Sequence, residues 1–349
     1  MYIKINLILF CFSKLGSGVK YIIDTDPGVD DAQALILALN SKISPAPEIL
    51  AITCGPGNVG ATQSARNVVR ILKLIGRTDI PVVTGVNDPI VEPHEMDFYF
   101  GRDGLGDRGD LRPGPSLADD RFVNERLAVQ TIIHLIRSNP GEVVVVCLGP
   151  LTNLAMALRL EPDIKHLVRH VYLMGGNIQG MGNVKPAVEF NFKIDPEAAH
   201  VIIREMNATI FPWEVSLNNP VPWEWYETYI SGHNQITRFM AGIAEDVIKA
   251  RKARNLQYEI VDGAAMAIAL NPKLATKVEA KSATVELHGD ETRGMLVVDW
   301  RTDRQIPPAN CKIITEINLP GILEMLYDSV QEPKKRKPRV IVQKQYINV

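Results

Sequence analysis

The sequence has 349 residues, of which 46% are hydrophobic and 22% are charged, and its formal net charge at pH 7 is −2. These values are ordinary for a globular protein and leave room for one large α/β domain or two small ones. The near-neutral charge gives no electrostatic reason to expect nucleic acid or an anionic membrane as a partner. No stretch reaches the ~20 apolar residues that span a bilayer.

Residues 1–18 precede the first predicted strand and have two interpretations. Leu7–Phe12 is apolar, follows Lys4, and leads to the small residues Gly16–Gly18, which is a short imitation of a secretory signal. The segment is therefore either an N-terminal extension or a weak signal-like segment. We expect a cytoplasmic protein, or a secreted one if the segment belongs to a signal peptide. The cysteines lie far apart without a C-x-x-C pair, so neither a zinc site nor a disulfide framework is expected.

An acidic stretch stands between the first predicted strand and the first predicted helix. Asp24–Asp31 holds four carboxylates within eight residues. It follows the apolar run Val19–Ile23 and precedes Ala32–Leu39, which has helical periodicity. Pro27 and Gly28 favour a tight turn before that helix, and Asp30 is predicted to be its N-cap.

The charges in this stretch exceed what a helix N-terminus explains. A helix N-terminus favours nearby negative charge, which accounts for Asp30 and Asp31. In an extended segment, Asp24 and Asp26 point to the same side, since the strand period is two. Like charges this close repel one another unless a cation or a shared proton relieves them. The stretch is either a solvated acidic loop or an oxygen-ligand site for Ca²⁺ or Mg²⁺, and we favour the cation site.

Strand and helix patterns alternate along the rest of the chain. Strands are predicted at 49–54, 81–85, 142–148 and 170–176, and helices at 62–75, 125–137 and from Pro196 onward, with Asp195 as its cap. A β-hairpin near Ala283–Trp300 and a helix near Ile322–Val330 follow. Such alternation predicts an α/β fold with a Rossmann-like open, mostly parallel sheet and helices on both faces. We expect one domain over residues 19–331 and a solvated basic tail over 332–349.

Several polar motifs fall at the carboxyl ends of the predicted strands, where open α/β sheets bind their ligands. They are the acidic stretch, the Gly57-Asn58 turn, the end of the strand at Leu148 and the loop Asn183–Asn191. The segment 86–124 is long, polar and rich in glycine and proline. Its aromatic and glycine residues at Tyr99–Asp107 predict an ordered lid.

An ordered series of motifs extends over most of residues 19–330. The series comprises Asp24–Ala32, Gly57-Asn58, Asp103–Gly106, Gly149–Asn153, Leu173–Gly176, Glu189–Asn191, Asp195–Ala198 and Asp262–Ala264. In content and order it resembles the inosine-uridine preferring nucleoside hydrolase family. The resemblance implies the nucleoside hydrolase fold, in which a Ca²⁺-dependent enzyme hydrolyses the N-glycosidic bond of a ribonucleoside to ribose and free base. It also implies a homodimer or a homotetramer, with a small-molecule ribonucleoside as substrate.

The resemblance also implies roles for individual residues. The metal ligands would be Asp26, Asp31, Asp262 and the backbone carbonyl of Leu148. Asp26 would in addition be the catalytic base that activates water. The substrate-binding residues would be Asp30, Asn58, Met174, Asn183, Glu189, Asn191 and Asp262. Ca²⁺ takes six to eight oxygen ligands, which the aspartates, a carbonyl, water and sugar hydroxyls supply together.

The sequence departs from the family pattern at two positions. Many relatives carry a histidine where this chain has Val261, and another where it has Phe100. Either imidazole would assist departure of the base, so the group that protonates the base is unassigned. Tyr258, Arg254, Trp213 and Trp225 are candidates for stacking on the base or donating to it, and simple packing explains each of them too. The histidines of the chain match no catalytic position of the family.

Two other functions stay open at this stage. The missing histidines are compatible with a catalytically weak nucleoside- or ribose-binding protein of the same fold. Asp24-x-Asp26 after the first strand is also similar to the start of a haloacid-dehalogenase-type phosphatase. Pro27 departs from that second pattern, and a phosphatase would not explain the asparagines and Asp262 as sugar ligands.

Overall fold

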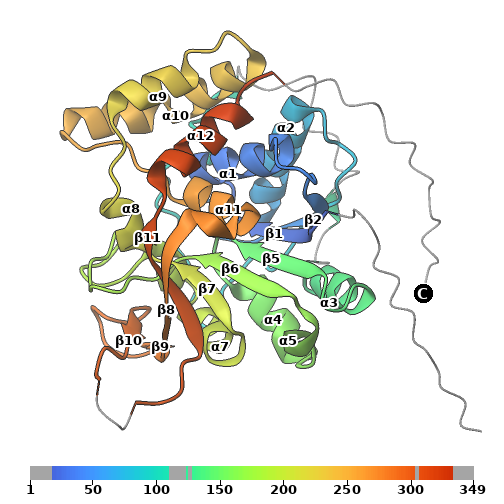
Figure 1. The fold of residues 1–349 in the computed structure, drawn as a ribbon, viewed down its shortest axis with the longest axis vertical. Helices are drawn as coiled ribbons and strands as arrows, with labels where there is room; N and C mark the ends of the chain where they lie inside the picture. Colours follow the sequence, from blue (N-terminus) through green and yellow to red (C-terminus); the bar gives the residue numbers. More distant parts are fainter. Residues whose placement is uncertain (1–17, 110–122, 125–127, 303–305, 333–349) are drawn as a thin grey trace, which may run out of the picture.

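The computed structural model describes residues 18–109, 123–124, 128–302 and 306–332. In this part of the chain a nine-stranded sheet has the order β4-β3-β2-β1-β5-β6-β7-β11-β8 (Figure 1). All neighbouring strands pair in parallel except β8, which runs antiparallel to β11. The strands are β1 (Lys20–Thr25), β2 (Glu48–Cys54), β3 (Val82–Thr84), β4 (Val123–Asn124), β5 (Val143–Cys147), β6 (His170–Met174), β7 (Ala208–Phe211), β8 (Ala275–Lys281) and β11 (Cys311–Ile317). The predicted open, mostly parallel sheet is confirmed.

The direction in which strands are added reverses between β1 and β5. From β1 the order runs through β2 to β4 on one side and through β5 to β7 on the other. β5 is apolar and buried along its whole length, and β1 is buried from Tyr21 to Thr25, as expected for strands covered on both faces. In open α/β sheets, ligands bind at such a reversal, beyond the carboxyl ends of the strands. The acidic stretch begins in the last two residues of β1 and Leu148 follows β5, so both lie at this point.

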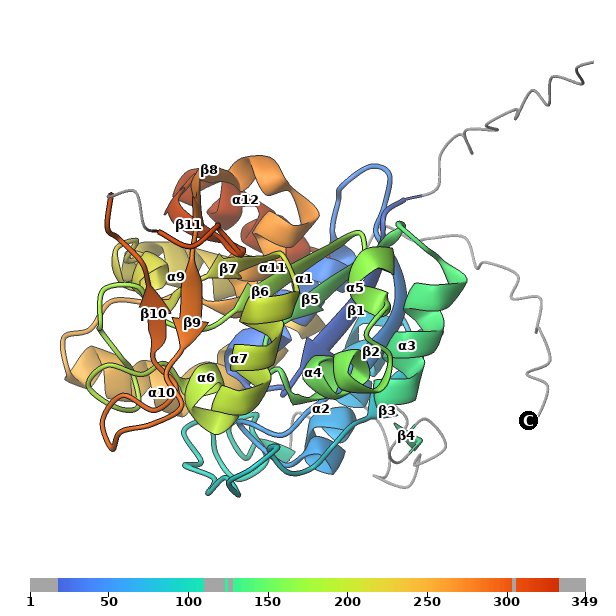
Figure 2. The same cartoon turned by 90° about the horizontal axis from the view of Figure 1, so that it is seen from below.

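Helices cover both faces of the sheet and bury two apolar cores (Figures 1 and 2). Alternating residues of β1 divide between them: Tyr21 and Ile23 face one core and Ile22 faces the other. The first face carries α1 (Val29–Asn40), α2 (Ala61–Ile75), α9 (Trp223–Ile230), α10 (Gln235–Ala253), α11 (Asp262–Leu270) and α12 (Leu319–Ser329). The second carries α3 (Ala128–Ser138), α4 (Thr152–Leu160), α5 (Ile164–Leu167) and α7 (Pro196–Glu205). The remaining helices are α6 (Phe190–Ile194), α8 (Trp213–Leu217) and the short 3₁₀ turn Pro272–Leu274.

The local predictions are confirmed in most places and corrected in one. Asp195 caps α7 through its side chain, with Pro196 at the first helical position, and the predicted hairpin forms as β9 (Ala283–Val285) paired with β10 (Leu296–Val298). The prediction that Asp30 is the N-cap of the first helix is wrong. The helix begins at Val29, its N-cap is Gly28, and the N3 residue Asp31 accepts a hydrogen bond from the Gly28 N–H at 3.0 Å. The helix therefore starts two residues earlier than a capping Asp30 requires.

Two predictions fall outside the described residues. Residues 1–17 contain the extension or signal-like segment, and residues 333–349 contain nearly all of the basic tail. Among the helices that the structure describes, none combines the length and apolar character needed to cross a membrane.

Candidate active site

Asp26, directly after β1, occupies a seat formed by two glycine turns, which follow the carboxyl ends of β2 and β5. Its Oδ2 accepts the Asn58 N–H at 2.8 Å, and its backbone oxygen accepts from Asn58 Nδ2 at 3.2 Å. A Cβ placed on Gly57 would meet Asp26 Oδ2, and one placed on Gly149 would meet Asp26 Oδ1. The Gly57 and Gly149 turns thus hold both oxygens of this carboxylate in one position.

The Gly57→Ala substitution should therefore lower activity by displacing the Asp26 carboxylate. We expect a fall of about 100-fold in kcat/KM, the scale on which a misplacement near 1 Å acts. Gly55→Ala is the matched control, because its Cβ would first meet Asn153 Nδ2 at 3.5 Å, an ordinary contact. Steady-state kinetics of both variants, with thermal unfolding to confirm folding, test the effect. Equal activity in the two variants would contradict this account of the seat.

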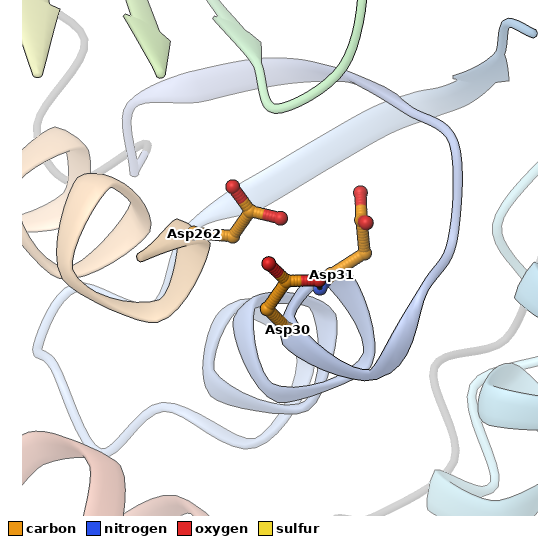
Figure 3. Close-up of side chains that lie close together, drawn as sticks. All are labelled: Asp30, Asp31 and Asp262. Carbon is orange, nitrogen blue, oxygen red and sulfur yellow. Dashed lines mark hydrogen bonds between the residues drawn. The ribbon is translucent and has the colours of Figure 1, made fainter. Parts of the chain in front are cut away.

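Three carboxylates from the first turns of two helices point toward one another (Figure 3). Asp26 lies close enough to interact with them electrostatically. Asp30 and Asp31 lie in the first turn of α1, and Asp262 is the first residue of α11, which packs against α1. One oxygen from each lies within 4.8 Å of the others. Asp31 is held by the Thr25 hydroxyl, by the Gly28 N–H and by Asn58 Nδ2 at 3.3 Å. The predicted meeting of Asp262 with the acidic stretch therefore takes place.

Within the part of the chain that the structure describes, no basic side chain forms an ion pair with this cluster or with Asp26. Burial and the neighbouring aspartates raise the pKa values of Asp26 and Asp262 well above the ordinary range, and the same causes raise that of Asp30 to about 7. Each ionised carboxylate thus destabilises the ionised form of the others. A cation with oxygen ligands would relieve this repulsion, so the donor set fits a hard divalent metal.

A second group of polar residues faces the cluster from the loop after β6. Glu189 is buried, caps α6 by accepting from the Asn191 and Phe192 N–H groups, and also accepts from the Gly176 N–H at 2.8 Å. Burial raises its pKa to about 7. Asn191 Nδ2 donates to the Leu148 carbonyl at 2.7 Å and to the Met174 carbonyl at 3.1 Å. These bonds join the ends of β5 and β6 to the loop.

The predicted site residues fall into clear groups in the structure. Asp26, Asp31, Asp262 and Asn58 lie together, and Asp30 completes the carboxylate cluster. Leu148, Met174, Glu189 and Asn191 form the second group. Asn183 is exposed and accepts the Phe190 N–H through Oδ1 at 2.9 Å, so it belongs to the rim of that group.

Asp24, the remaining acid of the stretch, has structural bonds instead. Its Oδ1 accepts the Thr53 hydroxyl at 2.5 Å and Asn153 Nδ2 at 3.0 Å. These bonds link β1 to β2 and to α4 at the sheet's centre. Burial raises its pKa to about 6. The acidic stretch thus has two roles. Asp24 stabilises the fold, whereas Asp30 and Asp31 belong to the carboxylate cluster and Asp26 lies beside it.

The positions of the missing histidines carry apolar side chains beside the site. Phe100 lies directly over Gly28, where a Cβ would meet its ring at 2.6 Å. Val261 precedes Asp262 and is nearly buried. The segment with Phe100 is folded by turns, in which Gly101, Gly104 and Gly106 all have positive φ. It lies against the α1 and α2 side, since Asn67 Nδ2 donates to the carbonyls of Pro27 and Asp103.

The four residues that the sequence suggests for contact with the leaving nucleobase lie in different surroundings. Tyr258 stacks with Trp225, packs against Tyr226, and accepts Gln33 Nε2 through its hydroxyl at 3.0 Å. Burial, and to a smaller extent the neighbouring Tyr229, Tyr226 and Asp30, raises the pKa of Tyr258 well above its ordinary value. Arg254 is exposed at the end of α10, and Trp213 packs against the core.

His94 is a residue that sequence reasoning missed. Its Nε2 lies 3.2 Å from the Gly57 carbonyl oxygen, and its ring meets Phe190 edge to face with centroids 5.9 Å apart. It is half-buried, and burial lowers its pKa. No sequence signal separates it from the other histidines, because its position depends on how residues 86–109 fold back over the site.

A cavity of about 350 Å³ lies at the opposite edge of the sheet. His170 and Thr209 line it from the beginnings of β6 and β7, while Met174, at the end of β6, faces the Asn191 side chain. It is open to solvent and contains no carboxylate in its lining, which also includes Tyr172, Ile268, Pro272, Ala275, Val278, Ala280 and Lys312. This cavity is separate from the carboxylate cluster.

Comparison with known proteins gives the arrangement a family. The model of the family described as inosine-uridine preferring nucleoside hydrolase matches residues 21–324. The pyrimidine-specific ribonucleoside hydrolase RihA of Citrobacter koseri is 31% identical over 87% of this chain and 96% of its own length. Among solved structures, an inosine-guanosine nucleoside hydrolase superposes with a TM-score of 0.80 at 32% identity, covering 90% of this chain and 98% of that one. A purine-preferring ribonucleoside hydrolase from Gardnerella vaginalis gives a TM-score of 0.77 at 28% identity, covering 89% and 98%.

The family match and the site agree with each other. The matched region contains the carboxylate cluster, the Asp26 seat and the Glu189–Asn191 group. The resemblance drawn from the motifs is confirmed. The chain belongs to the inosine-uridine preferring nucleoside hydrolase family and is an enzyme of the nucleoside hydrolase class.

Proposed function

We propose that this chain hydrolyses the N-glycosidic bond of ribonucleosides with the help of Ca²⁺, and that Asp26 is the general base. The convergence of Asp30, Asp31 and Asp262 beside the rigidly seated Asp26 carries the proposal. Family membership supports the reaction class, and the uncompensated carboxylates support a bound divalent cation. The family match leaves no role for the phosphatase alternative.

The metal would be held by side chains from both ends of the sequence. Asp26, Asp31, Asp262 and the Leu148 carbonyl are the predicted ligands, and the close approach of Asp30 adds a further carboxylate to the donor set. All donors are oxygens, which suits Ca²⁺ better than a softer metal. Bound Ca²⁺ would lower the pKa of a water molecule and orient it toward the sugar.

Asp26 is suited to accept the proton of that water. Its carboxylate is buried and fixed between Gly57 and Gly149, so its direction is set before substrate binds. Burial and Asp31 raise its pKa, which strengthens it as a base. The remaining aspartates place negative charge beside the sugar, where an oxocarbenium-like transition state develops positive charge.

The sugar would be held by residues from both groups. The Nδ2 groups of Asn58 and Asn191 already donate to protein oxygens, so their side-chain oxygens would accept from the sugar, which suits hydroxyl groups better than a phosphate. Asp30 and Asp262 would bind on the cluster side, and Asn183, Glu189 and Asn191 on the opposite side, with Met174 beneath. For the leaving base, Tyr258 is the best-placed described donor among the four candidates, because its hydroxyl accepts from Gln33 and keeps its own proton free.

The experiment is a steady-state comparison of inosine, adenosine, guanosine, uridine and cytidine with Ca²⁺ present. We expect equal amounts of free base and ribose from at least one of them. The named relatives differ in their bases, since one is pyrimidine-specific and another acts on inosine and guanosine, so all five substrates are needed. Tight binding of ribose with no release of base would instead identify a binding protein. Assembly as a homodimer or homotetramer and a cytoplasmic location stay predictions.

A further inference from the structure

His94 lies where the two halves of the proposed sugar pocket meet. On one side it contacts the Gly57 carbonyl, in the turn that seats Asp26 and presents Asn58. On the other side its ring packs against Phe190, which stands between Glu189 and Asn191 and bonds to Asn183 through its backbone N–H. His94 itself comes from a third segment, the loop after β3.

The contact with Gly57 determines which nitrogen of His94 carries the proton. A carbonyl oxygen only accepts, so Nε2 must be the donor in the 3.2 Å contact. In the neutral ring, Nδ1 then holds a lone pair and acts as an acceptor. No described residue forms a hydrogen bond with Nδ1. The ring therefore brings one free acceptor to the boundary between the two groups of site residues.

The shape of a ribonucleoside indicates what this acceptor meets. The 2′ and 3′ hydroxyls are adjacent and suit joint binding by a hard cation and its carboxylates. The 5′ hydroxyl projects from the opposite end of the ribose ring. With the diol at Asp30, Asp31 and Asp262, the 5′ hydroxyl points toward the group formed by Asn183, Glu189, Asn191 and the adjoining Phe190.

We propose that His94 is a substrate-binding residue that accepts a hydrogen bond from the nucleoside 5′ hydroxyl through Nδ1. The proposal rests on the proposed nucleoside hydrolase function and assigns a contact within that site. It gives the loop after β3 a role in selecting substrates that carry a free 5′ hydroxyl. The imidazole thus replaces neither missing histidine, because its one N–H is already committed to Gly57.

The test is the ratio of kcat/KM for uridine to that for 5′-deoxyuridine, with inosine and 5′-deoxyinosine as a second pair. The wild-type chain should prefer the substrates that carry the 5′ hydroxyl. His94→Phe keeps a ring against Phe190 but has no acceptor, and it should reduce the ratio about tenfold, the scale of one hydrogen bond. His94→Gln supplies both a donor and an acceptor and should recover part of the ratio. His170→Phe is the matched control, because His170 is also partly buried and bonded, to Thr209 at 2.8 Å, at the opposite edge of the sheet.

The outcomes separate the contact from a purely structural role. If His94 only supports the loop, His94→Phe will lower kcat/KM equally for both substrates of a pair. The ratio then stays unchanged, which overturns the proposal. His94→Leu gives the same comparison if the Phe variant does not fold. Release of no base by the wild-type chain overturns the proposed function instead. In that case, calorimetric dissociation constants for the same substrate pairs test the contact of His94 with the 5′ hydroxyl. An equal ratio of these constants in wild type and His94→Phe overturns the proposal.

Discussion

Replacing Asp26 with Asn should abolish most nucleoside hydrolysis while leaving the fold intact. The substitution keeps the size of the side chain, so it fits between Gly57 and Gly149, and its carbonyl oxygen can still accept the Asn58 N–H. It removes the carboxylate that would accept a proton from water in the proposed mechanism. Loss of a positioned general base costs about 10²- to 10⁴-fold in kcat. Steady-state kinetics on the best of the five nucleosides, with circular dichroism to confirm folding, measure the effect.

Asp24→Asn is the matched control for this substitution. Asp24 is two residues away on the same strand end and equally buried, but it bonds to Thr53 and Asn153 and lies outside the carboxylate cluster. We expect it to lower the thermal unfolding midpoint, since charged hydrogen bonds become neutral, and to retain most of kcat. Wild-type kcat in Asp26→Asn would exclude Asp26 from the role of base. A larger loss of kcat in Asp24→Asn than in Asp26→Asn would show that the two roles are reversed.

The position of the site could be predicted from the sequence because it depends on chain order. Alternating strands and helices determine a parallel sheet, and the polar turns after β1, β2, β5 and β6 all fall at the same edge of such a sheet. The reversal between β1 and β5 is a consequence of the fold that places the acidic stretch beside Leu148. The order of strands and polar turns along the chain is therefore enough to predict at which edge of the sheet the site lies.

The composition of the site could not be predicted from local patterns alone. Asp262 meets Asp30 and Asp31 because α11 packs against α1, and nothing in the residues around Asp262 indicates that packing. Asp262 is predicted as a site residue only by the resemblance to the family. His94 matches no catalytic position of the family and lies in a loop whose course depends on tertiary contacts, so neither local pattern nor resemblance indicates it. The predicted cap of α1 is wrong because the N-cap is Gly28, which has no capping side chain, and Asp31 at N3 accepts the Gly28 N–H instead. A search for a capping side chain at the N-cap position does not consider this arrangement.

Removal of Ca²⁺ should silence the enzyme and lower its stability together. Without the ion, the clustered carboxylates repel one another in a buried site. An ion that binds only the folded state stabilises it by about 2.7 kcal/mol when the free ion concentration is 100 times the dissociation constant. Exhaustive treatment with EDTA should therefore abolish base release and lower the unfolding midpoint, and added Ca²⁺ should restore both. Asp262→Asn should weaken the Ca²⁺-dependent shift of the midpoint, while Asp24→Asn should keep it. Full activity after exhaustive chelation would refute the metal mechanism.

The effect of Ca²⁺ should also depend on pH, in a direction set by the carboxylates. Burial and the neighbouring Asp31 raise the pKa of Asp30 to about 7, above its value in the unfolded chain. Between the two values the folded protein binds more protons than the unfolded one, so the stability of the metal-free protein falls as pH rises. In the proposed site, Ca²⁺ would replace those protons and bind the ionised form, so its affinity should rise over the same interval. The increase in unfolding midpoint on adding Ca²⁺ should consequently be larger at pH 8 than at pH 5, and an increase that is equal at both would mean that the ion binds elsewhere.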